Sequence, residues 1–173
     1  GSYNTFLGTN AGDANTTASN NTAVGYSALT ANTTGYENVA VGKSALSACT
    51  EGFQNTAIGH NSGAGITTGD DNVFVGDACG QATTTANSNT AVGRAALASN
   101  TTGADNTAVG KGAMDANTTA TRNTAVGSLS LDANTTGGRN AALGYATLSS
   151  NTTGQYNVAV GDIALQYNTT ASY

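Results

Sequence analysis

The sequence predicts an all-β fold, a parallel β-solenoid, and three observations indicate this fold class. First, Asn recurs every 17 residues through the 173-residue chain without an insertion or a deletion. Second, each unit contains one β-prone triplet, which is closed by Gly and followed in seven units by an Asn-Thr-Thr turn signal, with Gly next in four of them. Third, Ala, Thr, Gly and Asn dominate the chain, whereas Leu, Ile, Val and Phe total only 25 residues, too few for a conventional core. Charged residues are only 9% and proline is absent, so a disordered chain is not predicted either.

The repeat sets the domain organisation. Its consensus reads N-T-A-V-G-x-x-A-L-x-A-N-T-T-G-x-x, and positions are numbered 1 to 17 from the Asn. A unit of 17 residues is too short for a pair of helices, so each unit predicts one coil of the solenoid. Stacked coils lie about 4.8 Å apart, which gives a rod of roughly 50 Å. We treat 1–173 as a single repetitive domain and expect it to be a segment of a longer fibre. The ten units begin at Asn4, Asn21, Asn38, Asn55, Asn72, Asn89, Asn106, Asn123, Asn140 and Asn157.

Invariant positions should form columns along the rod. Position 1 is Asn, position 5 is Gly and position 13 is Thr in all ten units, and Gly suits a turn that has no room for Cβ. Fourteen of the fifteen charged residues fall at positions 6, 10, 16 and 17, and the exception is Glu51 at position 14. Burying a charge is costly, so these four positions should face solvent. The structural ladder is represented by Asn21, Gly25, Asn38, Gly42, Asn106, Gly110, Thr118 and Thr135.

The strand residues predict what each face contacts. Alternate residues of a strand face opposite sides, so positions 2 and 4 share one face and position 3 lies on the other. Position 3 is Phe instead of Ala at Phe6 and Phe74, and the same two units carry Gly instead of Leu at position 9, at Gly12 and Gly80. This exchange of volume predicts that positions 3 and 9 share the interior.

The other strand face is also apolar and needs a cover. A coil with about two sizeable aliphatic side chains is marginal on its own, because burial of so few apolar side chains does not offset the entropy lost in ordering 17 residues. We therefore expect a homo-oligomer, with a homotrimer as the favoured form, that buries positions 2 and 4 between copies.

The motif N-T-A-V-G-x-x-A-L resembles the head repeat of trimeric autotransporter adhesins, whose heads are left-handed parallel β-rolls associated as trimers. That head unit is shorter, so the likeness covers the strand and the Gly turn but not the Asn-Thr-Thr-Gly half. The full 17-residue unit is similar to repeat arrays in bacteriophage tail fibres, notably of marine phages, and in bacterial surface proteins. The resemblance implies a left-handed, trimeric solenoid located outside the cell, on a virion or a cell surface. It does not separate the two origins.

No catalytic, cofactor-binding or metal site is expected, and the chain is not predicted to be an enzyme. His60 stands alone at a variable corner, and the adjacent carboxylates Asp70 and Asp71 are not the facing pair that acid–base catalysis uses. Cys49 and Cys79 lie two coils apart, which is beyond disulfide reach. Five basic residues against ten acidic ones give no footprint for nucleic acid, and no apolar run is long enough to insert into a membrane.

The leading functional hypothesis is a structural or adhesive fibre segment that spaces or presents a receptor-binding tip. Its partners would be further copies of the chain and a cell-surface glycan or protein receptor. Tyrosines at variable positions are candidate receptor contacts, although solvent-facing decoration of a rod explains them equally well; they are Tyr26, Tyr36, Tyr145 and Tyr156.

Three other functions stay open. One is an ice-binding solenoid that uses its Thr ladders, although the adjacent positions 13 and 14 should face opposite sides. A glycan-cleaving fibre ranks lower, because the carboxylates are scattered. Another is a glycosylated extracellular filament, because Asn-Thr-Thr is a glycosylation acceptor in some hosts, while in a phage or bacterial protein it is a turn sequence. The candidate acceptors at position 12 are Asn15, Asn32, Asn100, Asn117, Asn134, Asn151 and Asn168.

Overall fold

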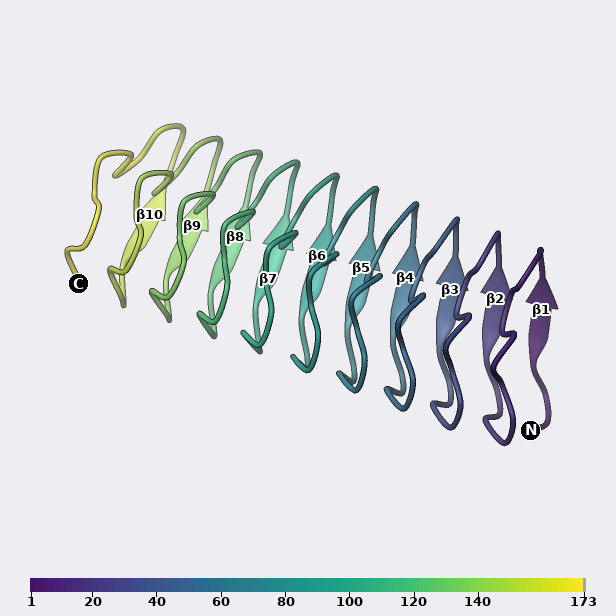
Figure 1. Cartoon of the computed structure of the whole chain (residues 1–173). Helices are drawn as coiled ribbons and strands as arrows, with labels where there is room; N and C mark the ends of the chain where they lie inside the picture. Colours follow the sequence, from purple (N-terminus) through teal and green to yellow (C-terminus); the bar gives the residue numbers. More distant parts are fainter. Residues whose placement is uncertain (173) are drawn as a thin grey trace.

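The structure, a computed structural model, describes residues 1–172 and contains ten short strands in one parallel sheet. The strands follow one another in chain order from β1 to β10, and no helix occurs in this part of the chain (Figure 1). The strands are β1 Thr5–Leu7, β2 Thr22–Val24, β3 Val39–Val41, β4 Thr56–Ile58, β5 Val73–Val75, β6 Thr90–Val92, β7 Thr107–Val109, β8 Thr124–Val126, β9 Ala141–Leu143 and β10 Val158–Val160.

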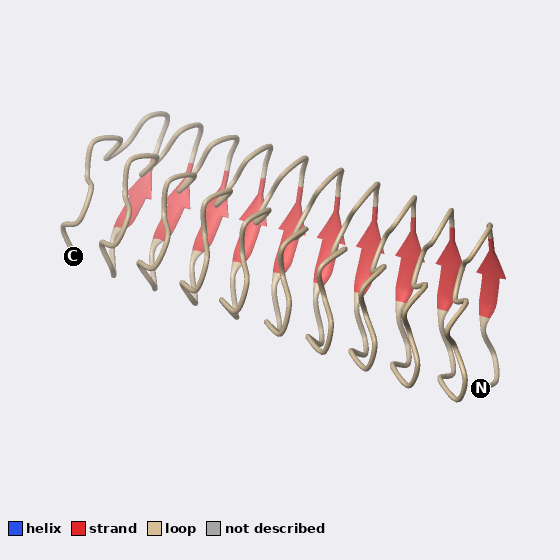
Figure 2. Ribbon diagram, in the orientation of Figure 1, coloured by secondary structure: helices blue, strands red, loops and turns tan. Residues whose placement is uncertain are grey.

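Each repeat forms one coil of a solenoid. Neighbouring strands pair with a register shift of one repeat, so that Thr22 lies beside Val39 and Ala23 beside Ala40. A coil contains one strand, and turns make up the rest of its path (Figure 2). The two termini lie at opposite ends of the rod (Figure 1). The predicted parallel β-solenoid with a 17-residue period is therefore confirmed.

Left-handed backbone conformations shape the corners of every coil. The glycines at position 5 have φ between 122° and 140°, and a Cβ on Gly25 would lie 2.6 Å from the carbonyl oxygen of Gly42 in the next coil. Glycine is therefore required at this position, as the sequence predicted. Positions 7, 9 and 17 are also left-handed throughout the described residues, and most of them carry ordinary side chains, as at Ser27 (φ 53°), Leu29 (φ 52°) and Glu37 (φ 59°). These additional left-handed residues were not predicted from the sequence.

Hydrogen bonds join successive coils well beyond the strands. The Leu29 amide donates to the Ala45 carbonyl at 2.9 Å, and the Thr33 amide donates to the Thr50 carbonyl at 2.9 Å. The Thr33 hydroxyl donates to that same Thr50 oxygen at 3.0 Å. The Thr column at position 13 thus contributes directly to coil stacking, because its hydroxyls bind the backbone of the following coil.

The interior contains positions 3, 8 and 9, where Ala, Ala and Leu stack in buried columns. The predicted exchange of volume is confirmed. A Cβ added to Gly80 would lie 2.5 Å from the ring of Phe74, and one added to Gly12 would lie 2.6 Å from the ring of Phe6. Each Phe therefore occupies the space that Leu fills in the other coils.

A third glycine at position 9, Gly63, has a different compensation. A Cβ added there would lie 3.4 Å from Cδ1 of Ile66 and 3.2 Å from Cδ2 of Phe74. Ile66 stands at position 12, where most coils have Asn, and it is fully buried. The missing leucine is thus replaced from within its own coil by Ile66 and from the next coil by Phe74.

Two columns of buried asparagines run along the interior. At position 1, Oδ1 of Asn21 accepts the amide N–H of Asn38 at 2.9 Å, and Nδ2 of Asn21 donates to the Gly35 carbonyl at 2.9 Å. The second column, at position 12, was not predicted as an interior feature: Nδ2 of Asn117 donates to Oδ1 of Asn100 at 2.8 Å. These contacts satisfy polar groups in an interior that has few large apolar side chains.

The second asparagine column is interrupted in the middle of the chain. Coils 3, 4 and 5 have Cys49, Ile66 and Thr83 at position 12. Oδ1 of Asn32, which precedes this interruption, has no hydrogen-bond partner, and neither does the hydroxyl of Thr83. Cys49 donates to the Gly52 carbonyl of its own coil instead of reaching Asn32. The break therefore leaves unsatisfied polar atoms at both of its ends, which carries a stability cost.

Candidate assembly face and exposed side chains

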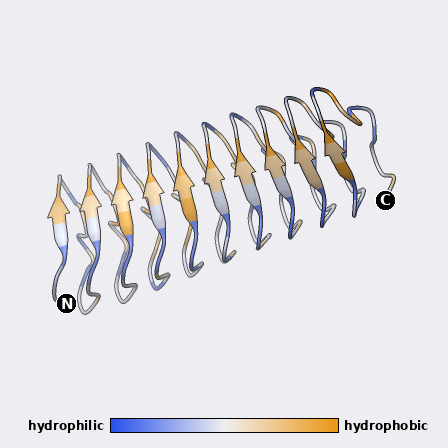
Figure 3. Ribbon diagram, turned by 180° about the vertical axis from the view of Figure 1, so that it is seen from behind, coloured by the Kyte–Doolittle hydropathy of each residue, from blue (hydrophilic) through white to orange (hydrophobic). Residues whose placement is uncertain are grey.

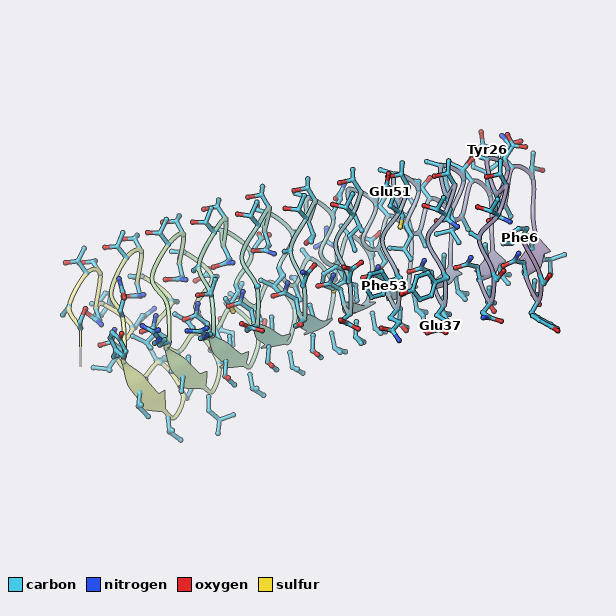
Figure 4. All side chains as sticks on the ribbon, turned by 90° about the horizontal axis from the view of Figure 1, so that it is seen from below. Phe6, Tyr26, Glu37, Glu51 and Phe53 are labelled. Carbon is cyan, nitrogen blue, oxygen red and sulfur yellow. The ribbon has the colours of Figure 1, made fainter. Side chains whose placement is uncertain are left out.

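The outer face of the sheet extends from coil 1 to coil 10, with an aliphatic side chain at position 4 of every coil and Thr, Val or Ala at position 2. Because position 3 points into the interior, positions 2 and 4 point outward, and none of these side chains is buried. Val92 is 38% exposed, Ile58 41% and Leu143 49%. Figure 3 shows the strands as a pale-to-orange row, and Figure 4 shows side chains standing clear of the strands along one side of the rod. We call this surface the strand face. Its residues at position 4 are Leu7, Val24, Val41, Ile58, Val75, Val92, Val109, Val126, Leu143 and Val160.

The strand face differs from the rest of the surface in its chemistry. Position 14, on a different part of the coil, is exposed in every coil and is Thr except at Glu51. Charged residues are absent from positions 1 to 5. No described residue of the chain packs over positions 2 and 4, so an apolar surface of this length is available for another molecule.

Charged side chains occupy the corners, as predicted. Most are exposed, and only Asp70 and Asp132 are half-buried. Burial raises the pKa of Asp132, and the neighbouring charge of Asp115 adds to this effect. The pKa of Asp115 is also raised by burial, against the opposing effect of the Arg94 charge. The two carboxylates stand at position 10 of successive coils.

Ion pairs form between neighbouring coils. His60 Nδ1 lies 2.8 Å from Asp77 Oδ1, and Arg94 Nε lies 3.6 Å from Asp77 Oδ2. Arg122 and Asp105 make a similar contact at 3.7 Å. These pairs are exposed, so each contributes little to stability. His60 is thus part of a row of charged and polar contacts on the surface.

The four candidate receptor-contact tyrosines are exposed but do not form one site. Tyr26 and Tyr145 share position 6 in coils 2 and 9, which lie roughly 34 Å apart at the strand spacing. Tyr156 lies in the position-17 column, where the Arg139 guanidinium sits 5.2 Å from its ring centre. Tyr36 lies at position 16 of coil 2. A ligand that contacts several of these residues would have to be long.

One aromatic pair was missed in the sequence. Tyr36 stacks on Phe53 of the next coil, with ring centroids 4.9 Å apart and an interplanar angle of 1°. Beside them, Gln54 Nε2 donates to Glu37 Oε2 at 3.0 Å, and Figure 4 shows Phe53 and Glu37 on the same side of the rod. Both residues of the pair stand at position 16, and their shared position could have revealed the contact. The pair forms a small flat surface with hydrogen-bonding groups next to it.

Both cysteines are free and fully buried. Burial raises the pKa of the Cys49 thiol to about 12, against the lowering effect of its hydrogen bond to Gly52. The pKa of the Cys79 thiol is likewise raised by burial to about 12. Such thiols are protonated and inaccessible at neutral pH, so they act as small apolar side chains.

The two Thr columns differ in what their hydroxyls do. At position 13 the side chains are mostly half-buried and their hydroxyls donate to backbone oxygens, as Thr118 does to Thr135 at 3.1 Å. At position 14 the side chains are exposed. One exposed rank is less than the two-dimensional array that an ice lattice would match. Ice binding stays a prediction, and thermal hysteresis near zero would eliminate it.

The candidate glycosylation sites at position 12 mostly point inward. Asn32, Asn100, Asn117, Asn134 and Asn151 are fully buried, and each Nδ2 donates a hydrogen bond to a carbonyl three residues later. A glycan on one of these nitrogens would have to leave the interior. The half-buried Asn15 and Asn168 lie in the terminal coils. Glycosylation stays a prediction that the intact mass of the protein would decide.

Other kinds of site have little support in the described residues. In residues 1–172 no group of three or more His, Cys, Asp or Glu side chains is placed to hold a metal ion, and no helix could cross a bilayer. A hollow of about 520 Å³ lies at the C-terminal end of the rod, lined by Ile163, Leu165 and Tyr167 among others. It corresponds to the space that the following coil fills elsewhere in the rod.

Comparison of the chain with protein-family models, with curated proteins and with solved structures found no match.

Proposed function

We propose that the chain is a structural segment of an extracellular fibre on a virion or a cell surface, in which copies pack side by side through the strand face. A homotrimer is the proposed form. The fibre segment acts as a spacer that holds a receptor-binding tip away from the surface, or it presents that tip itself. The observation that carries this proposal is the uncovered apolar strand face, which extends over all ten coils.

The composition of the coil supports self-association. Inside, the columns at positions 3 and 8 are mostly Ala, and one large side chain per coil, Leu at position 9 in six coils, supplies most of the buried apolar volume. The largest remaining aliphatic side chains, at position 4 of every coil and at position 2 of three coils, contribute little while they face water. Packing of one strand face against another removes them from water and adds a second hydrophobic layer to each coil. An exposed strip of this length would otherwise promote aggregation.

The number of copies comes from the resemblance to trimeric adhesin heads and phage-fibre repeats, and the regular rod suits a spacer. The test is the mass and shape of the purified chain in solution. Small-angle X-ray scattering should give an elongated particle near the predicted rod length, with three times the 16.9 kDa chain mass. A compact particle, or a monodisperse monomer, would refute the proposal.

The adhesive version of the function needs a separate test. The Tyr36–Phe53 stack with Glu37 and Gln54 beside it offers a flat aromatic surface next to polar groups, which suits a sugar ring. A glycan array probed with the wild-type chain and with Tyr36→Ala would detect such binding. Binding that Tyr36→Ala abolishes supports adhesion, whereas no binding by the wild type leaves the spacer role alone.

A further inference from the structure

Two columns of charged side chains border the strand face. Position 17 immediately precedes the Asn that leads into each strand, and position 6 follows the Gly that ends it, so the two columns lie along opposite edges of the face. Their charged side chains are exposed. At position 17 the charged residues are Glu37, Asp71, Asp105, Arg122 and Arg139, and at position 6 they are Lys43, Asp77, Arg94, Lys111 and Asp162, with His60 in the same column.

The two columns carry opposite charges at two of the strands. From β3 to β7 the position-17 edge is acidic, with Glu37, Asp71 and Asp105, whereas Lys43 and Lys111 are on the position-6 edge. Towards the C-terminus the position-17 edge becomes basic at Arg122 and Arg139, but the position-6 residues that border the same strands, Ser128 and Tyr145, are uncharged. Opposite charges therefore border the same strand at β3 and at β7.

The chain itself cannot pair these charges across the strand face. Glu37 and Lys43 are six residues apart at opposite ends of β3, a span of about 20 Å in extended chain. Asp105 and Lys111 border β7 in the same way. Neither lysine takes part in an ion pair within the described residues.

The one residue that departs from this pattern is already neutralised. Asp77 is the acidic member of the otherwise basic edge between β3 and β7, and it pairs with both His60 and Arg94 of its own column. Asp71 lies at the other end of β5, at position 17. A neighbouring copy would therefore bring an already paired Asp77 towards Asp71.

We propose that the partner of the strand face is a second copy of this chain that lies parallel and in register, with its position-6 edge against the position-17 edge of the first. This inference rests on the self-assembly proposed above and adds its direction and register. In a cyclic assembly around an axis along the rod, one edge of each copy meets the other edge of the next. Lys43 then meets Glu37 of the next copy, and Lys111 meets its Asp105. In an antiparallel pair each edge would meet its own column, so that Lys43 would not meet Glu37 and Lys111 would not meet Asp105.

Disulfide trapping tests the arrangement. Chains with Glu37→Cys and chains with Lys43→Cys are unfolded, mixed, refolded together and oxidised. The native thiols of Cys49 and Cys79 do not interfere, because both are fully buried. Covalent pairs should form in the mixture but not in either variant alone.

The outcomes separate the two proposals. Cross-links within either variant alone, or an assembled mixture without cross-links, would overturn the parallel register while leaving the fibre proposal in place. A monomeric mixture would overturn both. A control mixture with Thr102→Cys in place of Lys43→Cys, at the exposed position 14, should give no covalent pairs.

Charge reversal gives an independent test. Lys43→Glu with Lys111→Glu should raise the dissociation constant of the assembly about tenfold or more at low salt, and less at high salt. Adding Glu37→Lys and Asp105→Lys restores opposite charges on the two edges and should return the dissociation constant to near that of the wild type. The control for net charge carries four Thr→Glu changes at position 14, at residues 17, 85, 119 and 153, and should assemble like the wild type. The proposal would be overturned if the variant with all four changes had a dissociation constant as high as that of the variant with only the two Lys→Glu changes.

Discussion

The interior of coil 5 allows a quantitative test of how the coils are packed. Phe74 is fully buried and fills the space above Gly80, where most coils have Ala and Leu. Phe74→Ala should lower the free energy of unfolding by about 3–5 kcal/mol, because it opens a cavity. Gly80→Leu alone should lower it by about 1–3 kcal/mol, because even its Cβ would lie 2.5 Å from the Phe74 ring.

The double variant should recover most of this loss. With Phe74→Ala and Gly80→Leu together, coil 5 has the same residues at positions 3 and 9 as coil 6, where Leu97 is accommodated at φ 52°. A deficit of roughly 1–2 kcal/mol should remain, because Phe74 also fills space beside Gly63 and because Leu is strained in a left-handed conformation. The interaction free energy between the two positions should therefore be at least about 2 kcal/mol.

The assay is urea unfolding followed by far-ultraviolet circular dichroism. All variants are compared at one protein concentration, because assembly makes stability depend on concentration. Phe53→Ala is the matched control, since Phe53 is only half-buried, and it should cost no more than about 1 kcal/mol. Additive losses in the double variant would show that positions 3 and 9 do not share space, and this packing account would then be wrong.

Three further predictions concern the backbone, the asparagine column and the thiols. Ala95→Gly should leave the free energy of unfolding unchanged or raise it by up to about 1 kcal/mol, because Ala95 has the left-handed φ of 56°. Gly112→Ala, at the same position of the next coil, should lower the free energy of unfolding by about 1 kcal/mol. Urea unfolding compares the two variants, and a clear loss of stability in Ala95→Gly would contradict the left-handed corner. Asn106→Ala should cost about 1–3 kcal/mol in the same assay, because it leaves the buried backbone amide of Asn123 without an acceptor, while the Ala120 carbonyl keeps only Asn117 as a side-chain donor. A loss below about 0.5 kcal/mol would show that the column is dispensable. Burial raises the pKa of both thiols from 9.0 to about 12, so between these pH values only the unfolded chain ionises them. The free energy of unfolding should therefore fall as pH rises above 9, by up to about 1.4 kcal/mol per pH unit for each cysteine. Cys49→Asn with Cys79→Ala should reduce this slope, and an unchanged slope would show that the thiols are not its source.

The sequence predicted the period, the strand and the shared interior, because each depends on something that repeats. Gly at position 5 and the Phe–Gly exchange in coils 1 and 5 can be recognised from the residue types alone, and both reflect steric limits that the structure confirms. The compensation at Gly63 was not predicted, because Ile66 and Phe74 fill that space from a different position and a different coil. Contacts between coils depend on how far a side chain reaches along the rod, and the repeat alone does not give this distance.

The asparagine column at position 12 was also missed. Asn-Thr-Thr-Gly has the composition of an exposed turn, and nothing in its letters distinguishes an outward Asn from Asn117, which donates into the interior. Left-handed conformations at Leu29 and Ser27 were hidden for a similar reason, since such residues rarely adopt them. In both cases the bonds between coils impose a geometry that local preference does not predict. The strand face, by contrast, followed directly from alternation along a triplet.

Burial of the strand face between copies of the chain is the proposal on which the assembly depends. Sedimentation equilibrium of the wild type and of Val92→Asp with Val109→Asp tests it directly, because both changes place a charge on the strand face without touching the interior. Ala104→Asp with Thr121→Asp, at position 16, is the matched control. We predict three times the 16.9 kDa chain mass for the wild type and the control, and a single folded chain for the strand-face variant. A wild type that sediments as a monomer, or a strand-face variant that assembles as the wild type does, would contradict the account.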